Sequence, residues 1–526
     1  MVFVHLLREP PRHNITSGPD TEVDTFQNQN ATAHAQNMIL RSVTIYGTST
    51  DRRYAAIWHA NPNFVKWHIS PLDTDADYQA TFNAETQLPG YGLAGYRPAY
   101  VTLSSDYIYC SEFTDNVIGP WSARYGMTSN DYQGEFNKQT AHGFYPICVQ
   151  GGGVGDQTRY AAIFAQCDLP LTRQWTTRGT AVSALTGFDD IMQNFMQANA
   201  VRAAQLTIAK NGVIKLARAY TWAELGYHPT QTSDTFLLAS CSKIFTAAAI
   251  QSLYDANTLT GTTAVYPLLG FSHPADTRSE TITIQQLLDH KGGYDDTNTG
   301  SGFDPTYSMR QIGLSTTSSS SVDKLEIARY MYARSLDFTP GTDYKYSNFG
   351  YLLLSIVVEH VTNMDFFDYV QRTLLQPAHI SEVLLSSTLA SQRATNQAIC
   401  EDEGLGLSPT DLLSQLPVPA VYGGDGQIKE IAAGCAGIAA SATALTQFIH
   451  LYAVWGNGPR PANESPLLPS ARTGSTPGAS SLATSRSDGI DWAYVINTRD
   501  WPPQTQFMLD DLRTRIDALL NTMQIE

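Results

Sequence analysis

The pattern of apolar and polar positions predicts two different architectures that meet near residue 180. Before that point aromatic residues recur at a fixed interval, and after it helix-like and strand-like segments follow one another. In the second part, Phe236–Tyr254 opens with small and hydroxyl residues and continues with apolar positions at helical spacing, which predicts a helix buried on one face. The other segments predicted there are the strands Val201–Ala209, Val213–Tyr220 and Ile490–Asn497 and the helices Phe188–Ala198, Ile282–His290, Leu352–Val361, Ala442–Tyr452 and Gln504–Leu520.

This order of segments predicts an α/β sandwich in which one sheet is built from both ends of the second part. A helix and two strands joined by the hairpin signal Lys210-Asn211-Gly212 come first. A helical block follows, and late strands and a terminal helix close the chain. Residues 297–321, rich in Ser, Thr and Gly, are predicted to form a long loop near a cleft, and residues 401–430 are a second candidate for a cleft wall.

Residues 38–180 contain an internal repeat. Each unit is predicted to be an aromatic strand, a Trp-containing strand, a short helix and a turn into another strand. Regularly spaced aromatics are most often core residues that stack one unit on the next, so a core role is favoured over a platform for an extended polymeric substrate. The recurring residues are Tyr54, Tyr107 and Tyr160 at intervals of 53, Trp67, Trp121 and Trp175 at intervals of 54, and the triplet Asp-Tyr-Gln at 77–79 and 131–133.

The first 37 residues are rich in Asn, Gln, Thr, Pro and His without periodicity, which predicts disorder. Ile39–Thr50 looks like the tail of a repeat unit whose beginning is absent. The apolar stretch in Met1–Pro10 is too short for a signal peptide, so the chain as written carries no clear export signal. The predicted domains are therefore a disordered segment at 1–37, a tandem-repeat domain at 38–180 and a further domain at 181–526.

The net charge and the spacing of the cysteines limit the kinds of partner and cofactor that the chain is expected to bind. A formal net charge of −16 and a pI near 5.1 argue against nucleic acid and against an anionic membrane surface. No apolar run approaches the roughly 18 residues of a membrane span. The six cysteines lack the close spacing of metal ligands, so the sequence predicts no metal and no cofactor.

Two covalent features are also expected. Cys400 with Cys435 is the expected disulfide, whereas Cys241 is expected to be a buried free thiol. N-glycosylation sequons favour secretion, and they start at Asn14, Asn30 and Asn463.

The first candidate catalytic motif is Ser240-x-x-Lys243, a serine nucleophile and a lysine base. If a helix begins near Ser240, the two side chains share a face. The amine can then reach the hydroxyl at a helix N-terminus, where backbone N–H groups favour developing negative charge. Lysine can activate serine as a base only if its surroundings lower its pKa from about 10.4. A capped core helix with a solvated lysine would show the same residues, so this motif alone does not distinguish a catalytic pair from a structural helix.

Two motifs later in the chain favour a catalytic role for Ser240 and Lys243. Tyr346-Ser347-Asn348 places a phenol and an amide two positions apart before a helix, and Arg472-Thr473-Gly474 places a cation and small residues beside a late strand. In this order the three motifs resemble the serine β-lactamase and penicillin-binding superfamily, most closely its class C-like enzymes and related esterases and peptidases. The segments ITIQQLLDHKGGY and FTPGTDYKYSNFGY are similar to that family as well. The resemblance covers the chain from about residue 185 onward.

The resemblance implies a fold and a set of roles. It implies an antiparallel sheet flanked by helices plus an all-helical subdomain, behind a β-rich repeat domain. Ser240 would form an acyl-enzyme, and Lys243 and Tyr346 would move its proton, with the general base left open between them. Asn348 would hold Lys243 and the substrate amide. The backbone N–H groups of Ser240 and Ser475 would form the oxyanion hole.

The third motif departs from the family pattern, which usually begins with Lys or His. Arg472 stays protonated and can grip a carboxylate, but it cannot act as a base. Thr473 and Gly474 complete the motif as substrate-binding candidates.

An aromatic repeat ahead of such a domain is similar to the fungal polyglycine hydrolases. That resemblance implies a secreted serine endopeptidase that cuts glycine-rich linkers of proteins such as plant chitinases. Glycine has no side chain to recognise, so selectivity would come from a narrow cleft and from backbone hydrogen bonds. Two alternatives stay open: a hydrolase of small esters or amides, and a binding protein whose hydrolase domain is inert. The sequence leaves the oligomeric state open.

Overall fold

The computed structural model describes residues 15–86, 96–296, 303–316, 321–402, 404–454, 470–499 and 509–525. The chain divides into two compact units. The first holds residues 1–173 together with the short segment Glu224–Tyr227, and the second holds the remainder apart from 501–506.

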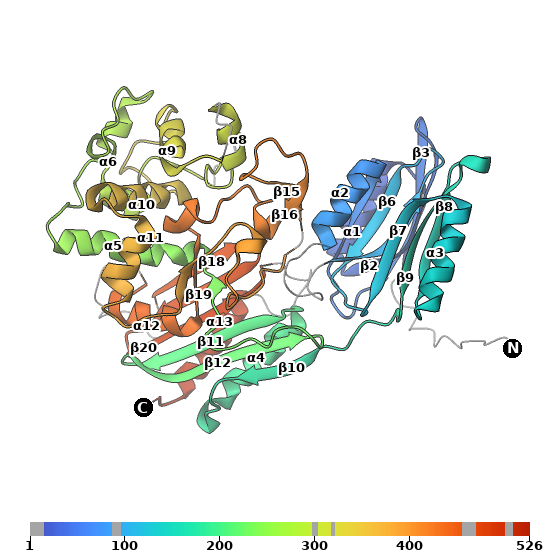
Figure 1. Ribbon diagram of the computed structural model, residues 1–526. Coiled ribbons are helices and arrows are strands. Elements are labelled where there is room, and N and C mark those ends of the chain that lie inside the picture. Colours follow the sequence, from blue (N-terminus) through green and yellow to red (C-terminus); the bar gives the residue numbers. More distant parts are fainter. Residues whose placement is uncertain are drawn as a thin grey trace. The chain divides into compact units, whose positions relative to one another are not determined.

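The first unit consists of three repeats, each with one helix and a three-stranded antiparallel sheet (Figure 1). In each repeat the chain runs strand, helix, strand, strand, and the last strand lies in the middle of the sheet. The repeats are β1 (Ile15–Thr21), α1 (Val23–Ala35), β2 (Met38–Thr48) and β3 (Asp51–Ala60); β4 (Trp67–Asp73), α2 (Asp75–Thr86), β5 (Arg97–Leu103) and β6 (Tyr109–Thr114); and β7 (Trp121–Met127), α3 (Ser129–Ala141), β8 (Tyr145–Gly152) and β9 (Arg159–Ala165).

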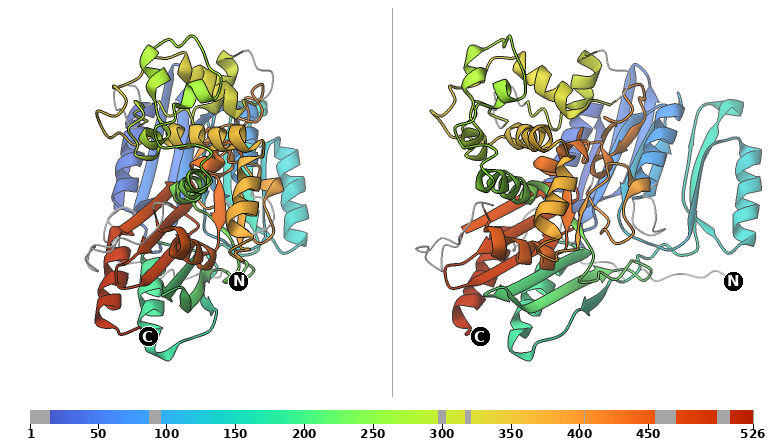
Figure 2. Two further views of the ribbon diagram at one scale, coloured as in Figure 1. Left: turned by 90° about the vertical axis from the view of Figure 1, so that its left-hand side faces the viewer. Right: turned by 60° about the vertical axis from the view of Figure 1, so that its left-hand side comes forward.

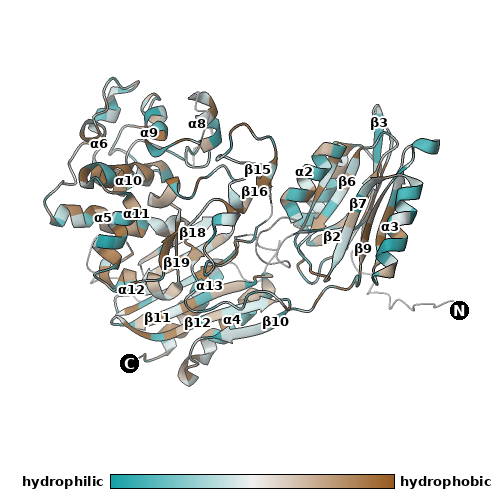
Figure 3. Ribbon diagram, in the orientation of Figure 1, coloured by the Kyte–Doolittle hydropathy of each residue, from teal (hydrophilic) through white to brown (hydrophobic). Residues whose placement is uncertain are grey.

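An aromatic pair between helix and central strand fixes each repeat. Phe26 of α1 stacks on Tyr54 of β3 with ring centroids 4.6 Å apart, and Tyr78 of α2 stacks on Tyr109 of β6 at 4.9 Å. The third pair, Tyr132 and Tyr160, lies at 5.5 Å. Stacked rings bury a large apolar area at the helix–sheet interface, so each helix is held on its own sheet. Figure 3 shows the largely apolar strand β9 beneath α3, whose outer side is polar.

These pairs correct the predicted repeat. Tyr109, not Tyr107, is the structural counterpart of Tyr54 and Tyr160, because all three occupy the same position of the central strand at the bulge. Tyr107 lies before β6 with a positive φ of 63°. Among the other recurring residues Tyr54 and Trp67 are buried core residues, whereas Trp121 and Tyr160 are half-buried.

The predicted elements follow one another along the chain in the predicted order, but the predicted start of each unit, at the aromatic strand, was wrong by one strand. Each unit begins at the strand before its helix, which is β1, β4 or β7. Residues 15–60 therefore form a complete unit, and Ile39–Thr50 is not the tail of an absent one. The prediction of disorder for residues 1–37 is wrong from residue 15 on, because β1 and α1 occupy that stretch, and residues 1–14 lie outside the described residues. Helix α1 is mostly polar on its outer face, and a few contacts such as the buried ring of Phe26 hold it on the sheet.

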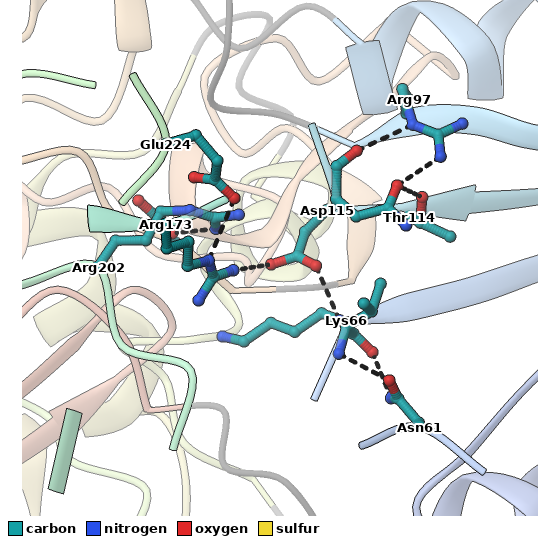
Figure 4. A network of polar contacts seen from close by, with 11 residues as sticks. Asn61, Lys66, Arg97, Thr114, Asp115, Arg173, Arg202 and Glu224 are labelled. Atoms are coloured by element: carbon teal, nitrogen blue, oxygen red, sulfur yellow. Dashed lines mark hydrogen bonds and ion pairs between the residues drawn. The ribbon is translucent and has the colours of Figure 1, made fainter. Parts of the chain in front are cut away.

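An ion-pair network lies near the end of the first unit (Figure 4). The guanidinium of Arg173 contacts Asp115 Oδ2 at 3.4 Å and Glu224 Oε1 at 3.1 Å, and all three side chains are largely buried. Asp115 also accepts a hydrogen bond from the backbone N–H of Lys66. Buried charges of opposite sign are tolerated when they are paired in this way.

The second unit is built on a six-stranded antiparallel sheet with the order β10-β12-β11-β20-β19-β18. Helix α12 covers one face, and α4 and α13 lie together on the other (Figures 1 and 2). The strands are β10 (Gln174–Arg178), β11 (Ala203–Lys210), β12 (Val213–Ala223), β18 (Ser470–Thr476), β19 (Ala479–Ser485) and β20 (Ile490–Ile496), and the helices are α4 (Thr186–Ala198), α12 (Ala442–Tyr452) and α13 (Leu509–Thr522). The predicted sheet built from both ends is confirmed.

A helical subdomain is inserted between β12 and β18. The long helices α5 and α10 form its centre, and both are almost wholly buried. Its helices are α5 (Ser242–Asp255), α6 (Val265–Leu268), α7 (Ile284–Leu288), α8 (Met309–Ser315), α9 (Lys324–Tyr332), α10 (Asn348–Thr362) and α11 (Phe366–Val370), and its short strands are β13 (Phe236–Leu237), β14 (Val383–Leu385), β15 (Leu405–Leu407), β16 (Pro417–Pro419) and β17 (Ile438–Ala440).

The first strand of the second unit explains one further difference. Trp175 repeats the spacing of the Trp residues, but it lies in β10, which pairs with β12 in the six-stranded sheet. Its partner across the strands is Trp222. The second unit therefore begins at Gln174, seven residues before the predicted start at residue 181.

The structure describes all six cysteines and one of the three sequon asparagines. The six cysteines are all free, so the expected disulfide between Cys400 and Cys435 is wrong, and the expectation of a buried free thiol at Cys241 is confirmed. The sequon residue Asn30 lies within α1 and accepts a hydrogen bond from Trp58 Nε1, while Asn14 and Asn463 lie outside the described residues. No helix in the described part of the chain is long and apolar enough to cross a membrane.

Candidate active site

Ser240 lies in the turn that leads into α5. A short 3-10 turn, η3 (Ala239–Cys241), precedes the helix, and Ala239 has a positive φ of 47°. A non-glycine residue in this region is strained, and such strain persists only where the surrounding structure enforces it. Ser240 is half-buried, whereas its neighbours Ala239 and Cys241 are buried. The turn therefore leaves the hydroxyl of Ser240 accessible at the start of a buried helix.

Lys243 is buried and held by three acceptors. Its Nζ donates to Ser240 Oγ at 3.0 Å, to Asn348 Oδ1 at 2.7 Å and to the backbone carbonyl of Cys435 at 2.9 Å. An ammonium has three N–H donors, and each has a partner here. Only 1% of Lys243 is exposed, so the alternative of a solvated lysine on a capped helix is wrong.

Tyr346 completes the contact with the hydroxyl. Its Oη lies 2.5 Å from Ser240 Oγ and donates to Asn348 Oδ1 at 3.2 Å. The Nζ of Lys243 lies 4.9 Å from the centre of its ring. Ser240, Lys243, Tyr346 and Asn348 thus form one hydrogen-bonded set around the serine hydroxyl.

His290 supports the ring of Tyr346, and sequence reasoning gave it no role. The two rings stack at 4.8 Å, and the backbone N–H of Ser347 donates to His290 Nδ1 at 3.1 Å. Burial, followed by the positive charges of Lys243 and Arg472, lowers the pKa of His290 from 6.5 to about 3. The imidazole is therefore neutral and acts as an acceptor for the loop that carries Tyr346. Its position in ITIQQLLDHKGGY was the available signal.

Two acidic residues, also without a predicted role, lie behind Asn348 at the N-terminus of α10. Asp296 accepts hydrogen bonds from the backbone N–H groups of Asn348 and Phe349, and Asp304 Oδ2 accepts from Asn348 Nδ2 at 2.7 Å. Burial, followed by the negative charge of Asp304, raises the pKa of Asp296 well above its usual range. Asp296 immediately precedes the predicted long loop 297–321 and Asp304 lies within it; residues 297–302 and 317–320 of that loop lie outside the described residues, and 309–315 form α8.

The third motif lies on β18, the edge strand of the sheet. A Cβ on Gly474 would lie 2.0 Å from the carbonyl oxygen of Leu238 and 3.1 Å from the backbone nitrogen of Cys241. Only glycine therefore allows the strand to approach the turn of Ser240 this closely. Thr473 and Ser475 on either side are exposed.

Arg472 is directed toward a ring rather than toward the serine. Its Nη2 donates to Tyr351 Oη at 3.0 Å, and its guanidinium carbon lies 5.3 Å from the centre of that ring. Tyr351 in turn donates to the carbonyl of Leu288. The described residues contain no group of three or more His, Cys, Asp or Glu side chains that could hold a metal ion.

A serine hydroxyl contacted by a buried lysine and a tyrosine, beneath a sheet flanked by helices, defines a serine hydrolase. The family model described as beta-lactamase matches residues 188–504, more than half of the chain, and the chain therefore belongs to that family. A second model, described as the structural repeat of polyglycine hydrolase-like proteins, matches residues 22–61 and 118–166. The first unit thus carries that repeat ahead of the hydrolase.

Individual relatives are more distant. "Protein flp" of Staphylococcus aureus is 25% identical over 202 residues, which is 38% of this chain and 38% of that protein. The chain thus spans about two fifths of the length of the curated relatives it matches. A beta-lactamase/D-alanine carboxypeptidase from Yersinia pestis is 14% identical with a TM-score of 0.47, over 64% of this chain and 100% of that one. A D-stereospecific amidohydrolase from Streptomyces is 20% identical with a TM-score of 0.44, over 64% and 99%.

Proposed function

We propose that this protein is a secreted serine endopeptidase that forms an acyl-enzyme at Ser240 and cuts glycine-rich linkers of proteins such as plant chitinases. The observation that carries the chemical part is the closed set of contacts around the serine hydroxyl, with Tyr346 Oη at 2.5 Å and Lys243 Nζ at 3.0 Å. The repeat of the polyglycine hydrolase-like type supports the substrate part. A fungal source and N-glycosylation belong to the same proposal.

The contacts favour Tyr346 as the base that receives the proton of Ser240. Lys243 donates to three acceptors and has no lone pair free while it is an ammonium. Tyr346 acts as the base after losing its own proton, when it no longer donates to Asn348, and the phenolate beside the ammonium then accepts the proton as Ser240 Oγ bonds to the scissile carbonyl carbon. The proton then passes to the leaving amine as the C–N bond breaks. In deacylation Tyr346 takes a proton from water as the water oxygen bonds to the acyl carbon, and it gives that proton to Ser240 Oγ as the acyl–Ser240 bond breaks.

Charge on the carbonyl oxygen would be stabilised by two backbone N–H groups, those of Ser240 and Ser475. The close approach of β18 at Gly474 supports this pairing, because it brings the edge strand against the turn of the nucleophile. Each such donor is worth roughly 3 kcal/mol in the transition state. Asn348 would hold Lys243 and the substrate amide, and Thr473 would face the substrate beside Arg472.

Two features support an extended substrate with small residues. β18 is at the edge of its sheet, so an extended peptide can add to it through backbone hydrogen bonds. Next to Ser475, the hydroxyl of Thr476 hydrogen-bonds Tyr307 Oη at 2.8 Å. The ring of Tyr307 therefore restricts the space beside the edge strand, which suits a residue that has no side chain. No cofactor takes part, and neither nucleic acid nor a membrane is a partner in this proposal.

The test is mass spectrometry of a glycine-rich chitinase linker after incubation with the wild-type protein and with Ser240→Ala. We expect cleavage between glycines by the wild type only. A second linker of equal length with every other glycine replaced by alanine controls for selectivity, and we expect it to be cut at least tenfold more slowly. Cleavage by the Ser240→Ala variant would refute the assignment of Ser240 as the nucleophile. Equal cleavage of both linkers would refute the proposed selectivity for glycine.

A hydrolase of small esters or amides is the second candidate. The match of the beta-lactamase family model to residues 188–504 favours it, because that match depends on no feature of the repeats. Ser240-dependent turnover of a short-chain ester without cleavage of either linker would favour this function over the endopeptidase.

A further inference from the structure

The side-chain amide of Asn348 carries an oxygen and an NH2 group of nearly the same shape. The oxygen accepts hydrogen bonds, whereas the NH2 group donates them. Its Oδ1 accepts from Lys243 Nζ at 2.7 Å and from Tyr346 Oη at 3.2 Å, while its Nδ2 donates to Asp304 Oδ2 at 2.7 Å. A rotation of the amide by half a turn would place an NH2 group against the ammonium of Lys243. It would also place an oxygen against the carboxylate of Asp304.

Asp304 is itself rigidly held. Its second oxygen, Oδ1, accepts from the backbone N–H of Thr306 at 2.8 Å and from the hydroxyl of the same residue at 2.7 Å. Thr306 is fully buried, so this arrangement does not exchange with solvent contacts. Asp304 therefore offers Asn348 a fixed acceptor and no donor.

The main chain of Asn348 is held by a different carboxylate. Asp296 accepts from the backbone N–H groups of Asn348 and Phe349 and from Ser347 Oγ at 3.2 Å. Two half-buried acidic side chains near each other are costly, and loss of solvation, followed by the negative charge of Asp304, raises the pKa of Asp296. One acid would suffice to cap α10, so the second calls for a separate role.

We propose that Asp304 is a positioning residue, which fixes the amide of Asn348 so that its oxygen faces Lys243 and Tyr346. Through Asn348 it holds the ammonium and the phenol within hydrogen-bond distance of Ser240 Oγ. Asp304 touches neither the serine nor the substrate. This inference rests on the proposed role of Ser240 and deepens it.

The test is an exchange of the two side chains in the full-length protein. Asp304→Asn leaves one oxygen to serve both Asn348 and Thr306, so one hydrogen bond is lost. Asn348→Asp places two carboxylate oxygens against each other. In the double variant the new amide at 304 donates to the new carboxylate at 348, its oxygen still accepts from Thr306, and Lys243 keeps an acceptor. The double variant also conserves net charge.

We expect each single variant to lose about 10- to 100-fold in kcat for a short-chain ester, with KM little changed. The double variant should recover at least tenfold in kcat over Asn348→Asp, which a purely structural role of Asp304 would not produce. Asp323→Asn, at the exposed N-cap of α9, is the matched control and should keep wild-type kcat. A double variant no better than Asn348→Asp, with wild-type content of folded protein, would overturn the proposal.

The same four proteins give a second measurement in urea unfolding. A favourable coupling between the two substitutions in the unfolding midpoint supports the contact independently of activity. Additive midpoints together with additive losses in kcat would overturn the inference. Absence of Ser240-dependent turnover in the wild type, with coupled unfolding midpoints, would instead refute the proposed function and leave the contact standing.

Discussion

Replacing Tyr346 by Phe isolates the proton transfer from the packing around it. The substitution removes Oη, which lies 2.5 Å from Ser240 Oγ and 3.2 Å from Asn348 Oδ1. A positioned acid–base group contributes about 10²- to 10⁴-fold to rate, so the barrier should rise by about 3–5 kcal/mol. The ring can remain stacked on His290 at 4.8 Å. Folding should therefore lose only about 1–3 kcal/mol, the worth of the two part-buried hydrogen bonds of Oη.

The assay is steady-state hydrolysis of a short-chain ester, with thermal unfolding measured on the same samples. Tyr344→Phe is the matched control, because Tyr344 also contacts His290, with its ring edge-on at 5.7 Å, but is largely exposed. We expect Tyr346→Phe to lose at least 100-fold in kcat/KM and Tyr344→Phe to stay within threefold of the wild type. A Tyr346→Phe protein within threefold of the wild type would refute the assignment of the phenol as the proton acceptor.

Three further predictions follow from the geometry. Gly474→Ala should cost about 1–3 kcal/mol and most of the activity, because its Cβ would lie 2.0 Å from Leu238 O. Gly134→Ala, in α3 with open space around it, should instead raise the unfolding temperature, and the reverse order in thermal unfolding would contradict both. The pKa of His290 is about 3 when folded and 6.5 when not, so its contribution to stability is present above pH 6.5 and is lost as the pH falls toward 3. The unfolding temperature of the wild type should thus fall more between pH 7 and pH 4 than that of His290→Gln, and parallel profiles would show that His290 is not buried in its neutral form. Titration of thiols in unfolded, unreduced protein should find all six cysteines, whereas a count lower by two would restore the disulfide of Cys400 with Cys435.

The sequence predicted the hydrolase unit well because its signals are local. Helix Ala442–Tyr452 was predicted with the bounds it has, and Ser240 and Lys243 were predicted to share the start of one helix. Tyr346 and Asn348 flank the start of α10, so one short motif placed both. Their convergence on one hydroxyl depended on the resemblance, since the contacts span more than a hundred residues of chain.

The repeat was harder to predict because spacing alone does not define its phase. Tyr107 lies at the expected interval, yet the stacked partner of Tyr78 is Tyr109, two residues further on. Helix α1 lacks the Asp-Tyr-Gln signal, and Phe26 takes the place of the tyrosine. A polar sequence with one anchoring ring was therefore mistaken for disorder.

The acids behind Asn348 carried no signal in the sequence. Asp296 immediately precedes a Ser-, Thr- and Gly-rich stretch without periodicity and Asp304 lies within it, where an acidic residue is ordinarily solvated. Their half-buried positions depend on contacts between the start of α10 and that stretch, which form only in the folded chain. Such contacts appear only once the fold is known, and they are where the structure adds most to the account of the site.

The measurement that tests the central claim most directly is the intact mass of the protein after reaction with a fluorophosphonate probe. The account predicts one adduct on the wild-type protein, mapped to Ser240 by peptide sequencing, and no adduct on Ser240→Ala. Tyr346→Phe should acquire the same adduct much more slowly. A wild-type protein that takes up no probe, or one labelled at a residue other than Ser240, would contradict the account.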